Sequence, residues 1–361
     1  MQNIQLTYSL DPASTPRGPI YNPLMALLHA VQEQGSISAA AKSLHLSYRH
    51  VWGELKRWET QLGDTLLVWD KGQAARLSPF GTRLLYAERQ AQARLAPQIE
   101  ALQAELERSF AMAFEPKSQV LSLYASHDEA LSRLRSHCAK KHLHLDITFT
   151  GSVDAIRALN EGRCVMAGFH TTLPCPTGSL TQRTYQPLLQ PGLHKMIGFA
   201  LRRQGLIVPP GNPQGVLGLA DVRDKNLRFS NRALGTGTRL LLDELLALGK
   251  IKPSQITGYR HTEPSHAAVA QAIAQGGADV GLGIAAAASA LGLDFVPLVQ
   301  ERYDLVCLKT ALNDPAVKTL CRLLQSAAWQ VQLHTLPGYQ LANSGRVVSL
   351  TQTLPWWQFE D

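Results

Sequence analysis

The first eighty residues carry hydrophobic positions at helical spacing, separated by short turns. Apolar side chains recur every three or four positions over 24–31, before Gly35, and predict a first helix. The small side chains of 38–44 predict a short second helix against which another helix can pack closely. A third helix is predicted after Ser47, whose hydroxyl stands where a helix N-cap is wanted. Its apolar stripe recurs at spacings of four, three and four residues, at Val51, Leu55, Trp58 and Leu62.

The outer face of this third helix is basic and aromatic near its N-terminal end, as reading of the DNA major groove requires. Residues 66–69 and 74–77 then flank a turn at 70–73 and predict a hairpin, or wing, with basic residues for the phosphate backbone. We therefore predict a winged helix-turn-helix DNA-binding domain over 1–78, although no role is evident for 1–20. Its predicted DNA contacts are Ser47, Tyr48, Arg49, His50, Trp52, Lys56, Lys71 and Arg76.

A long helix is predicted next, over 79–114, because Ser78 offers a capping hydroxyl and Pro79 suits the first helical position. Its only internal proline after that, Pro97, is expected to bend it. The pattern favours a linker helix that pairs with its twin in a dimer, and the alternative is a helix packed on its own domain. The predicted seam recurs at spacings of four and three: Leu84, Glu88, Ala91, Leu95, Ile99, Leu102 and Leu106.

From residue 119 onward, apolar runs of strand length alternate with helical patterns. Such alternation predicts parallel sheets with helices on their faces, and more than 200 residues are better divided between two lobes than placed in one. The predicted strands are 120–125, 145–149, 164–169, 197–201, 206–208, 227–230, 256–259, 280–284 and 295–298. The polar run 202–205 is flanked by two of these strands and separates them.

Composition changes this picture little. The formal net charge of +7 agrees with a polyanionic partner but does not require one. The five cysteines are odd in number and form no CxxC pair, the N-terminus has no signal-peptide pattern, and no apolar run reaches eighteen residues. We therefore expect a reduced, cytoplasmic setting without membrane insertion.

Two stretches give the N-terminal region a family resemblance. GSISAAA at 35–41 and LSPFGTRLL at 77–85 resemble the ends of the domain shared by LysR-type and molybdate-responsive ModE-type regulators. Ser47-Tyr48 with Val51-Trp52 is similar to the ModE form. The resemblance implies a transcriptional regulator that binds double-stranded DNA as a homodimer or a dimer of dimers.

The region 120–310 resembles the periplasmic-binding-protein fold, in the subgroup related to molybdate- and tungstate-binding proteins. The resemblance rests on 202–206, 211–213, 231–239 and 278–283. It implies an α/β bilobal effector domain over 119–361, behind an all-α winged-helix domain, with a small anion, molybdate or tungstate, between the lobes. The chain would cross between lobes near 195–200 and 297–299, which gives lobe I as 119–196 and 299–361 and lobe II as 197–298.

The predicted ligand site lies beyond the carboxyl ends of the strands, where helix N-termini point backbone N–H groups outward. Small hydroxyl residues recur there, and capping alone is the alternative role for each. The glycine-rich 235–239 lacks the ending of a nucleotide-binding P-loop, and a nest for a small oxyanion fits it better. The predicted effector contacts are Ser126, His127, Ser152, His170, Asn231, Arg232, Thr236, Thr238, Arg239, Ser265 and His266.

Other chemistry finds little support in the sequence. His137, Cys138, His142 and His144 match no standard zinc spacing, so we expect no metal or cofactor. GxSxG, HExxH and paired-carboxylate patterns are missing, so we predict a protein that is not an enzyme. Two alternatives remain open: a LysR-type regulator of an organic metabolite, and an enzyme of molybdenum-cofactor handling fused to a DNA-binding domain.

Overall fold

The computed structural model describes residues 21–69, 75–114 and 118–357. The chain divides into two compact units, Met1–Gln92 and Ala93–Asp361. Residues 1–20 and the tip of the predicted wing, including Lys71, lie outside the described residues, as does most of the predicted hinge at 114–118. Within the described parts, no helix has the length and apolar content that spanning a membrane requires.

The N-terminal unit is a winged helix-turn-helix, as the sequence predicts. Each helix begins at a side-chain cap: Asn22 for α1, Ser36 for α2 and Ser47 for α3. Gly35 ends α1 in the left-handed conformation, with φ of 67°. The elements are α1 (Pro23–Gln34), α2 (Ile37–Ser43), α3 (Tyr48–Leu62), β1 (Leu67–Val68), β2 (Arg76–Leu77) and the start of α4 (Pro79–Phe114).

One apolar core holds these elements together. The α3 residues Val51 and Leu55 are buried against α1 and α2, while the outward face of the same helix stays exposed. Gly81 of α4 lies so close to the Leu66 backbone that a Cβ there would be 2.4 Å from its carbonyl oxygen. The wing and the start of α4 are therefore packed as one piece with the helices.

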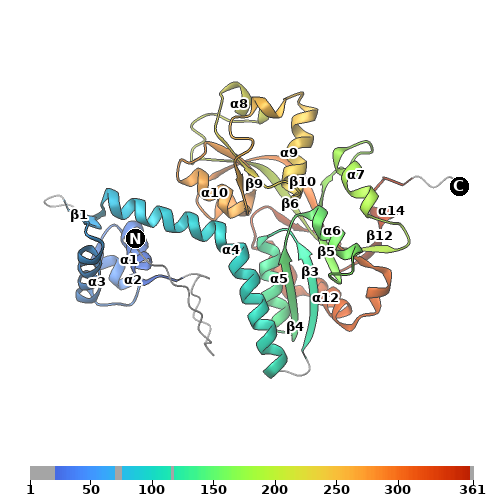
Figure 1. The fold of residues 1–361 in the computed structure, drawn as a ribbon, viewed down its shortest axis with the longest axis horizontal. Coiled ribbons are helices and arrows are strands. Elements are labelled where there is room, and N and C mark those ends of the chain that lie inside the picture. Colours follow the sequence, from blue (N-terminus) through green and yellow to red (C-terminus); the bar gives the residue numbers. More distant parts are fainter. Residues whose placement is uncertain (1–20, 70–74, 115–117, 358–361) are drawn as a thin grey trace. The chain divides into compact units, whose positions relative to one another are not determined.

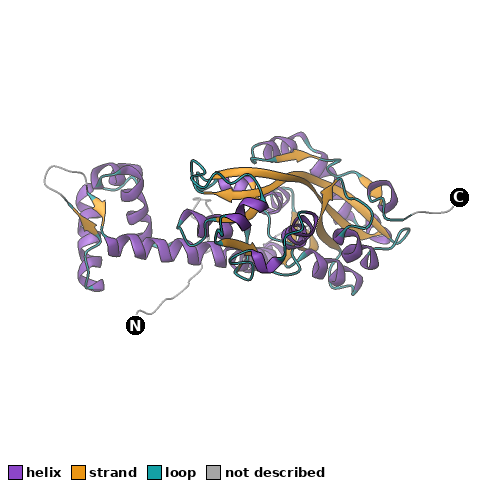
Figure 2. Ribbon diagram, turned by 90° about the horizontal axis from the view of Figure 1, so that it is seen from above, coloured by secondary structure: helices purple, strands orange, loops and turns teal. Residues whose placement is uncertain are grey.

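The C-terminal unit contains a mixed sheet with strand order β4-β3-β5-β10-β6-β9-β7-β8, and β11 and β12 also pair with β6. Figure 2 shows the strands in orange, with helices packed around them. Lobe I contains β3 (Gln119–Ala125), α5 (Glu129–Ala139), β4 (Leu143–Phe149), α6 (Ser152–Asn160), β5 (Met166–Leu173) and α7 (Leu180–Tyr185). Its C-terminal part is α12 (Pro315–Gln325), α13 (Ala327–His334), β11 (Tyr339–Leu341), β12 (Val347–Ser349) and α14 (Leu350–Thr353).

Lobe II is the smaller half of this unit, and α8, α9 and α10 gather in it (Figure 1). It contains α8 (Leu219–Asp224), β7 (Phe229–Arg232), α9 (Gly237–Leu248), β8 (Thr262–Glu263), α10 (His266–Ala274), β9 (Val280–Ile284) and α11 (Ala285–Ser289). Two long antiparallel strands, β6 (His194–Val208) and β10 (Asp294–Leu308), run through both lobes and connect them.

The structure corrects two expectations about strands. Residues 202–205 do not separate two strands, because β6 continues through them and Arg202 and Gly205 pair with Glu301 and Pro297 of β10. The predicted strand at 256–259 is a turn region, and the short β8 follows it at Thr262–Glu263. The sheet is also not wholly parallel, since β6, β9 and β10 are joined in antiparallel pairs.

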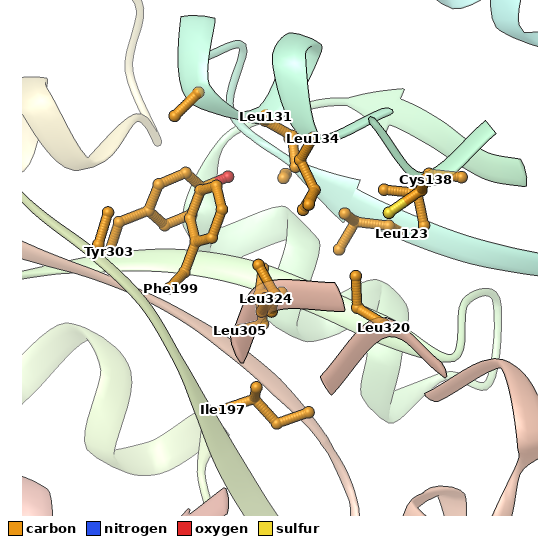
Figure 3. Packing of buried hydrophobic residues seen from close by; sticks show 14 of the residues in the cluster. Leu123, Leu131, Leu134, Cys138, Ile197, Phe199, Tyr303, Leu305, Leu320 and Leu324 are labelled. Atoms are coloured by element: carbon orange, nitrogen blue, oxygen red, sulfur yellow. The ribbon is translucent and has the colours of Figure 1, made fainter. Parts of the chain in front are cut away.

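Each lobe has a hydrophobic core of its own. In lobe I, side chains of β3, α5, β6, β10 and α12 pack together, among them Leu123, Leu134, Phe199 and Leu320 (Figure 3). A separate cluster in lobe II joins Leu206 and Phe229 to α9 and β9. The lobe I cluster also takes in Ile284 and Ala286 of β9 and α11, so apolar contacts cross between the lobes as well.

Residues 93–107 of α4 pack on the C-terminal unit at both lobes. Arg94 donates two hydrogen bonds, of 2.9 and 2.7 Å, to the buried carboxylate of Glu263 in lobe II. In lobe I, Glu100 accepts a 2.7 Å bond from Ser132 Oγ and lies 3.3 Å from His127 Nε2. This half of the helix thus packs on its own domain, the alternative left open by the sequence, while Leu95 and Leu102 stay exposed.

Candidate effector site and DNA-binding surface

A buried polar cluster lies where lobe I, lobe II and the connecting strands meet. It is built from the ends of β3, β5 and β7, the N-termini of α6, α9 and α10, and the middles of β6 and β10. Its polar side chains are at least nine-tenths buried: Ser126, Asp128, Ser152, His170, Thr171, Arg202, Gln204, Ser230, Arg232, Thr238, His266 and Glu301.

Arg202, in the middle of β6, is fully compensated. Its Nε donates to Glu301 Oε2 at 2.8 Å, and its Nη1 donates to Asp128 Oδ2. Tyr339 adds a 2.6 Å bond from its hydroxyl to the same Asp128 oxygen. Although burial opposes it, the two carboxylates raise the pKa of Arg202, so this guanidinium is a charged structural element of the site.

Arg232, at the end of β7, is in the opposite situation. Only 2% of it is exposed, and its Nε and Nη1 have no hydrogen-bond partner among the described residues. Burial, and then the nearby charge of Arg202, lower the pKa of Arg232 to about 9. A buried cation without a partner is costly, so its retention is most simply explained by a ligand that supplies negative charge.

Two neutral histidines stand beside this arginine. The His170 ring stacks on Tyr303 with 4.0 Å between centroids, and its Nδ1 lies 3.4 Å from Ser152 Oγ. His266 Nε2 lies 3.4 Å from Thr238 Oγ1. Burial, with Arg202 and Arg232 next, lowers the pKa of both rings well below the usual value. The second nitrogen of each, His170 Nε2 and His266 Nδ1, is buried without a partner among the described residues.

The N-termini of α6 and α9 bring the two lobes into contact at the cluster. A Cβ on Gly151, the residue before α6, would lie 2.5 Å from the carbonyl oxygen of Gly235, just before α9. The hydroxyl of Thr181 also donates a 2.6 Å bond to Glu244 across the same boundary. Two helix N-termini therefore converge beside Arg232 and the histidines, an arrangement that suits an anion.

Not every predicted effector residue belongs to this cluster. Asn231 uses its amide for the Tyr259 carbonyl, and Arg239 pairs with Asp243 and lies 4.0 Å over the Tyr259 ring. Thr236 and Ser265 cap α9 and α10, while His127 pairs with Glu100. Contacts join Ser152 to His170 and Thr238 to His266, and the charge of Arg232 acts on both rings. Ser126 is buried at the end of β3.

Sequence reasoning missed several members of the cluster. The sequence places Arg202 and Gln204 between two predicted strands, and the predicted effector contacts do not include Thr171, Ser230 or Glu301. Polar residues alternating within the otherwise apolar 194–208 were the available signal, because such positions inside a strand face a polar partner.

The predicted DNA-binding residues lie mostly on the outer face of the N-terminal unit. Ser47 caps α3 by accepting from the His50 backbone N–H, and Arg49 and His50 are exposed. Tyr48 and Trp52 expose 54% and 43% of their surface, so both aromatic side chains are available for contact. Two others lie nearby in the unit: Arg76 is exposed on β2, and Lys56 donates to Glu59 at 2.6 Å and lies 5.3 Å from the Trp69 ring.

The fold and site define a class of protein: a winged helix-turn-helix domain joined to a bilobal α/β domain with a buried polar site between its lobes. Residues 24–82 match the family of bacterial regulatory helix-turn-helix proteins of the lysR type. Residues 135–325, more than half of the chain, match the PBP superfamily domain, and the chain belongs to that family. A lysR-type helix-turn-helix domain is thus followed, in one chain, by a PBP superfamily domain.

Two curated relatives are similar in sequence. The uncharacterized protein YvgK of Bacillus subtilis (strain 168) is 32% identical over 200 residues, which cover 55% of this chain and 64% of YvgK. An uncharacterized protein in the 5′ region of a 2Fe-2S ferredoxin gene of Clostridium pasteurianum is 39% identical over 115 residues. That match covers 30% of this chain and 98% of the relative. The chain thus spans just under two thirds of the first relative's length.

Solved structures of LysR-type regulators are similar at lower identity. A Corynebacterium glutamicum OxyR mutant with bound H2O2 has a TM-score of 0.43 at 16% identity and covers 90% of this chain and 98% of its own. Full-length CbnR in complex with its target DNA has a TM-score of 0.38 at 19% identity, and the match covers 83% of this chain and 98% of the CbnR chain.

Proposed function

We propose that this chain is a LysR-type transcriptional regulator that binds a small tetrahedral oxyanion between the lobes of its C-terminal unit, with Arg232 as the counter-charge. The observation that carries the proposal is the buried guanidinium of Arg232, whose Nε and Nη1 have no partner among the described residues. An oxyanion oxygen accepts from such a group more strongly than a neutral acceptor does. Ser126, His170 and His266 supply further polar atoms that are buried and unpaired.

A compact anion suits this site better than a bulky organic ligand. The approach of Gly151 to Gly235 brings the lobes together at the cluster, and hydroxyl, imidazole and guanidinium groups dominate its surface. An organic ligand generally requires a larger apolar surface. Molybdate and tungstate are the proposed effectors, on the resemblance of 202–206, 231–239 and 278–283 to the binding proteins for these anions.

The N-terminal unit is proposed to bind double-stranded DNA through α3 and the wing, with two copies of the chain acting together. Exposed Tyr48, Arg49 and Trp52 support a role for α3 in the major groove. Leu95 and Leu102 are seven residues apart on α4 and 39% and 57% exposed. That exposure and spacing favour a seam with a second copy.

Isothermal titration of the ligand-free full chain with molybdate, tungstate and sulfate tests the anion site. Arg232→Gln should weaken binding at least about 100-fold, because two charge-assisted hydrogen bonds are each worth ~1.5–3 kcal/mol. The matched control is Arg228→Gln, which changes an exposed arginine that Asp279 already pairs, four residues earlier in the chain.

Thermal unfolding separates a binding role from a structural one. If Arg232 serves a ligand, Arg232→Gln should leave the ligand-free midpoint unchanged or raise it, because an uncompensated buried charge is removed. A lowered midpoint together with unchanged anion affinity would contradict the proposal. If the titration shows binding heat with an organic acid and none with the oxyanions, the proposed effector is wrong, but the proposed regulatory function is not contradicted.

A further inference from the structure

The orientation of one buried amide can be read from the carboxylate beside it. Glu301 Oε2 lies 2.8 Å from the Gln204 side-chain nitrogen and 2.8 Å from Arg202 Nε. An ionised carboxylate only accepts hydrogen bonds, so the Gln204 amide must turn its NH2 group toward it. The second N–H of the same NH2 group donates to Thr238 Oγ1 at 2.9 Å.

This donation determines the direction of the next hydrogen bond. Because the Thr238 oxygen accepts from Gln204, its own proton is free to point to another acceptor, and His266 Nε2 lies 3.4 Å away. A neutral imidazole that accepts at Nε2 carries its proton on Nδ1. His266 Nδ1 is buried and has no partner among the residues that the structure describes. The chain of bonds thus ends in an N–H donor left for a ligand.

We propose that Gln204 and Thr238 are positioning residues that hold His266 in its Nδ1–H form, so that the site selects oxyanions whose oxygens carry no proton. The inference rests on the proposed anion site and assigns it a ligand class. Free imidazole side chains in water prefer the Nε2–H form, so the network would impose the less common tautomer.

The selectivity follows from what these groups are able to accept. Neither the Arg232 guanidinium nor an Nδ1–H imidazole can accept a hydrogen bond through the atom it presents. Molybdate, tungstate and sulfate offer only acceptor oxygens at neutral pH. Hydrogen phosphate carries the same charge of −2 but has one O–H, which cannot bond to Arg232 or His266 and would have to turn to an unpaired acceptor elsewhere in the cluster, such as Gln204 Oε1 or Ser126 Oγ.

Histidine nitrogen NMR on the full chain tests the tautomer without any ligand. We expect wild-type His266, assigned by comparison with His266→Gln, to show a protonated Nδ1 and an unprotonated Nε2. Thr238→Val removes the hydroxyl while keeping the shape, and should shift His266 toward the Nε2–H form. Thr238→Ser should restore the wild-type pattern. Thr184→Val, in a threonine whose hydroxyl donates to the Leu180 carbonyl of its own helix, should leave the pattern unchanged.

Titration at pH 8 then tests the ligand class. The wild type should bind molybdate at least about tenfold more tightly than hydrogen phosphate, and Thr238→Val should narrow this ratio. An Nε2–H His266 in the wild type, or an equal ratio in wild type and Thr238→Val, would overturn the inference. If none of these anions binds, both the proposed anion site and its selectivity are wrong. The tautomer measured by NMR would still decide whether Thr238 positions His266.

Discussion

The N-termini of α6 and α9 are in contact, so a larger side chain at Gly151 can test whether anion binding requires the two lobes to approach each other. Gly151 has φ of −68° and ψ of 154°, which alanine adopts without strain. An alanine Cβ would nevertheless lie 2.5 Å from the Gly235 carbonyl oxygen and 2.7 Å from its carbon. Gly151→Ala therefore changes the approach of the two lobes and little else.

The size of the effect can be worked out from these distances. Ordinary contact begins near 3.4 Å, so the backbones must separate by 3.4 − 2.5, or about 0.9 Å, at this point. Crowding of one methyl group against fixed backbone costs ~1–3 kcal/mol. If the bound state needs the lobes in contact, the ligand must supply that energy, and its affinity should fall about 5- to 150-fold.

Titration of wild type and variant with molybdate measures this loss directly. Gly218→Ala is the control, because a Cβ there meets nothing within 4 Å and its extended backbone suits any residue. Thermal unfolding of both ligand-free variants should stay near the wild type, since the core of each lobe is untouched. Wild-type affinity in Gly151→Ala would show that the anion binds without the approach of α6 to α9, and would refute the reasoning.

Two further predictions concern the N-terminal unit and α4. Arg49→Ala should cost ~1–3 kcal/mol of binding to DNA selected from a random duplex library if Arg49 reads a base edge. Arg76→Ala should weaken all duplexes alike and reduce the salt slope by about one; unchanged DNA affinity in both variants would remove the assignment. The double variant Leu95→Asp with Leu102→Asp should be monomeric in sedimentation and should still bind the anion. The control Leu248→Asp, at a 74% exposed position on α9, should stay dimeric. A double variant that stays dimeric would show that the dimer contact lies elsewhere.

The helical N-terminal domain could be predicted closely because its signals are local. Ser47 and Gly35 lie at the ends of helices where their cap geometry is favourable, and the apolar spacing of α3 follows from its own turn. The order of helices and wing therefore followed from short stretches of sequence. The same holds for the α/β class of the C-terminal unit, where strand-length apolar runs alternate with helices.

The path of β6 could not be predicted in the same way, because its polar residues are satisfied by a strand almost a hundred positions away. Arg202 and Gln204 reach Glu301 across the β6–β10 pairing. Considered locally, 202–205 has the polarity and the glycine of a turn. Only the ladder with β10, which also satisfies the backbone there, makes a continuous strand the better solution.

The choice between Arg232 and Arg239 shows why a charged site depends on the partners more than on the sequence position. Arg232 is the last residue of β7 and Arg239 lies seven residues later in α9. The sequence predicts that both contact the anion. In the structure Asp243, one helical turn after Arg239, takes that guanidinium, and the Tyr259 ring covers it. Among the described residues no carboxylate bonds to Nε or Nη1 of Arg232, because Asp128 and Glu301 bond to Arg202, although the charge of Asp128 still raises the pKa of Arg232. The unsatisfied guanidinium donors therefore belong to Arg232, and those donors, more than the number of basic residues nearby, are what a ligand anion would bond.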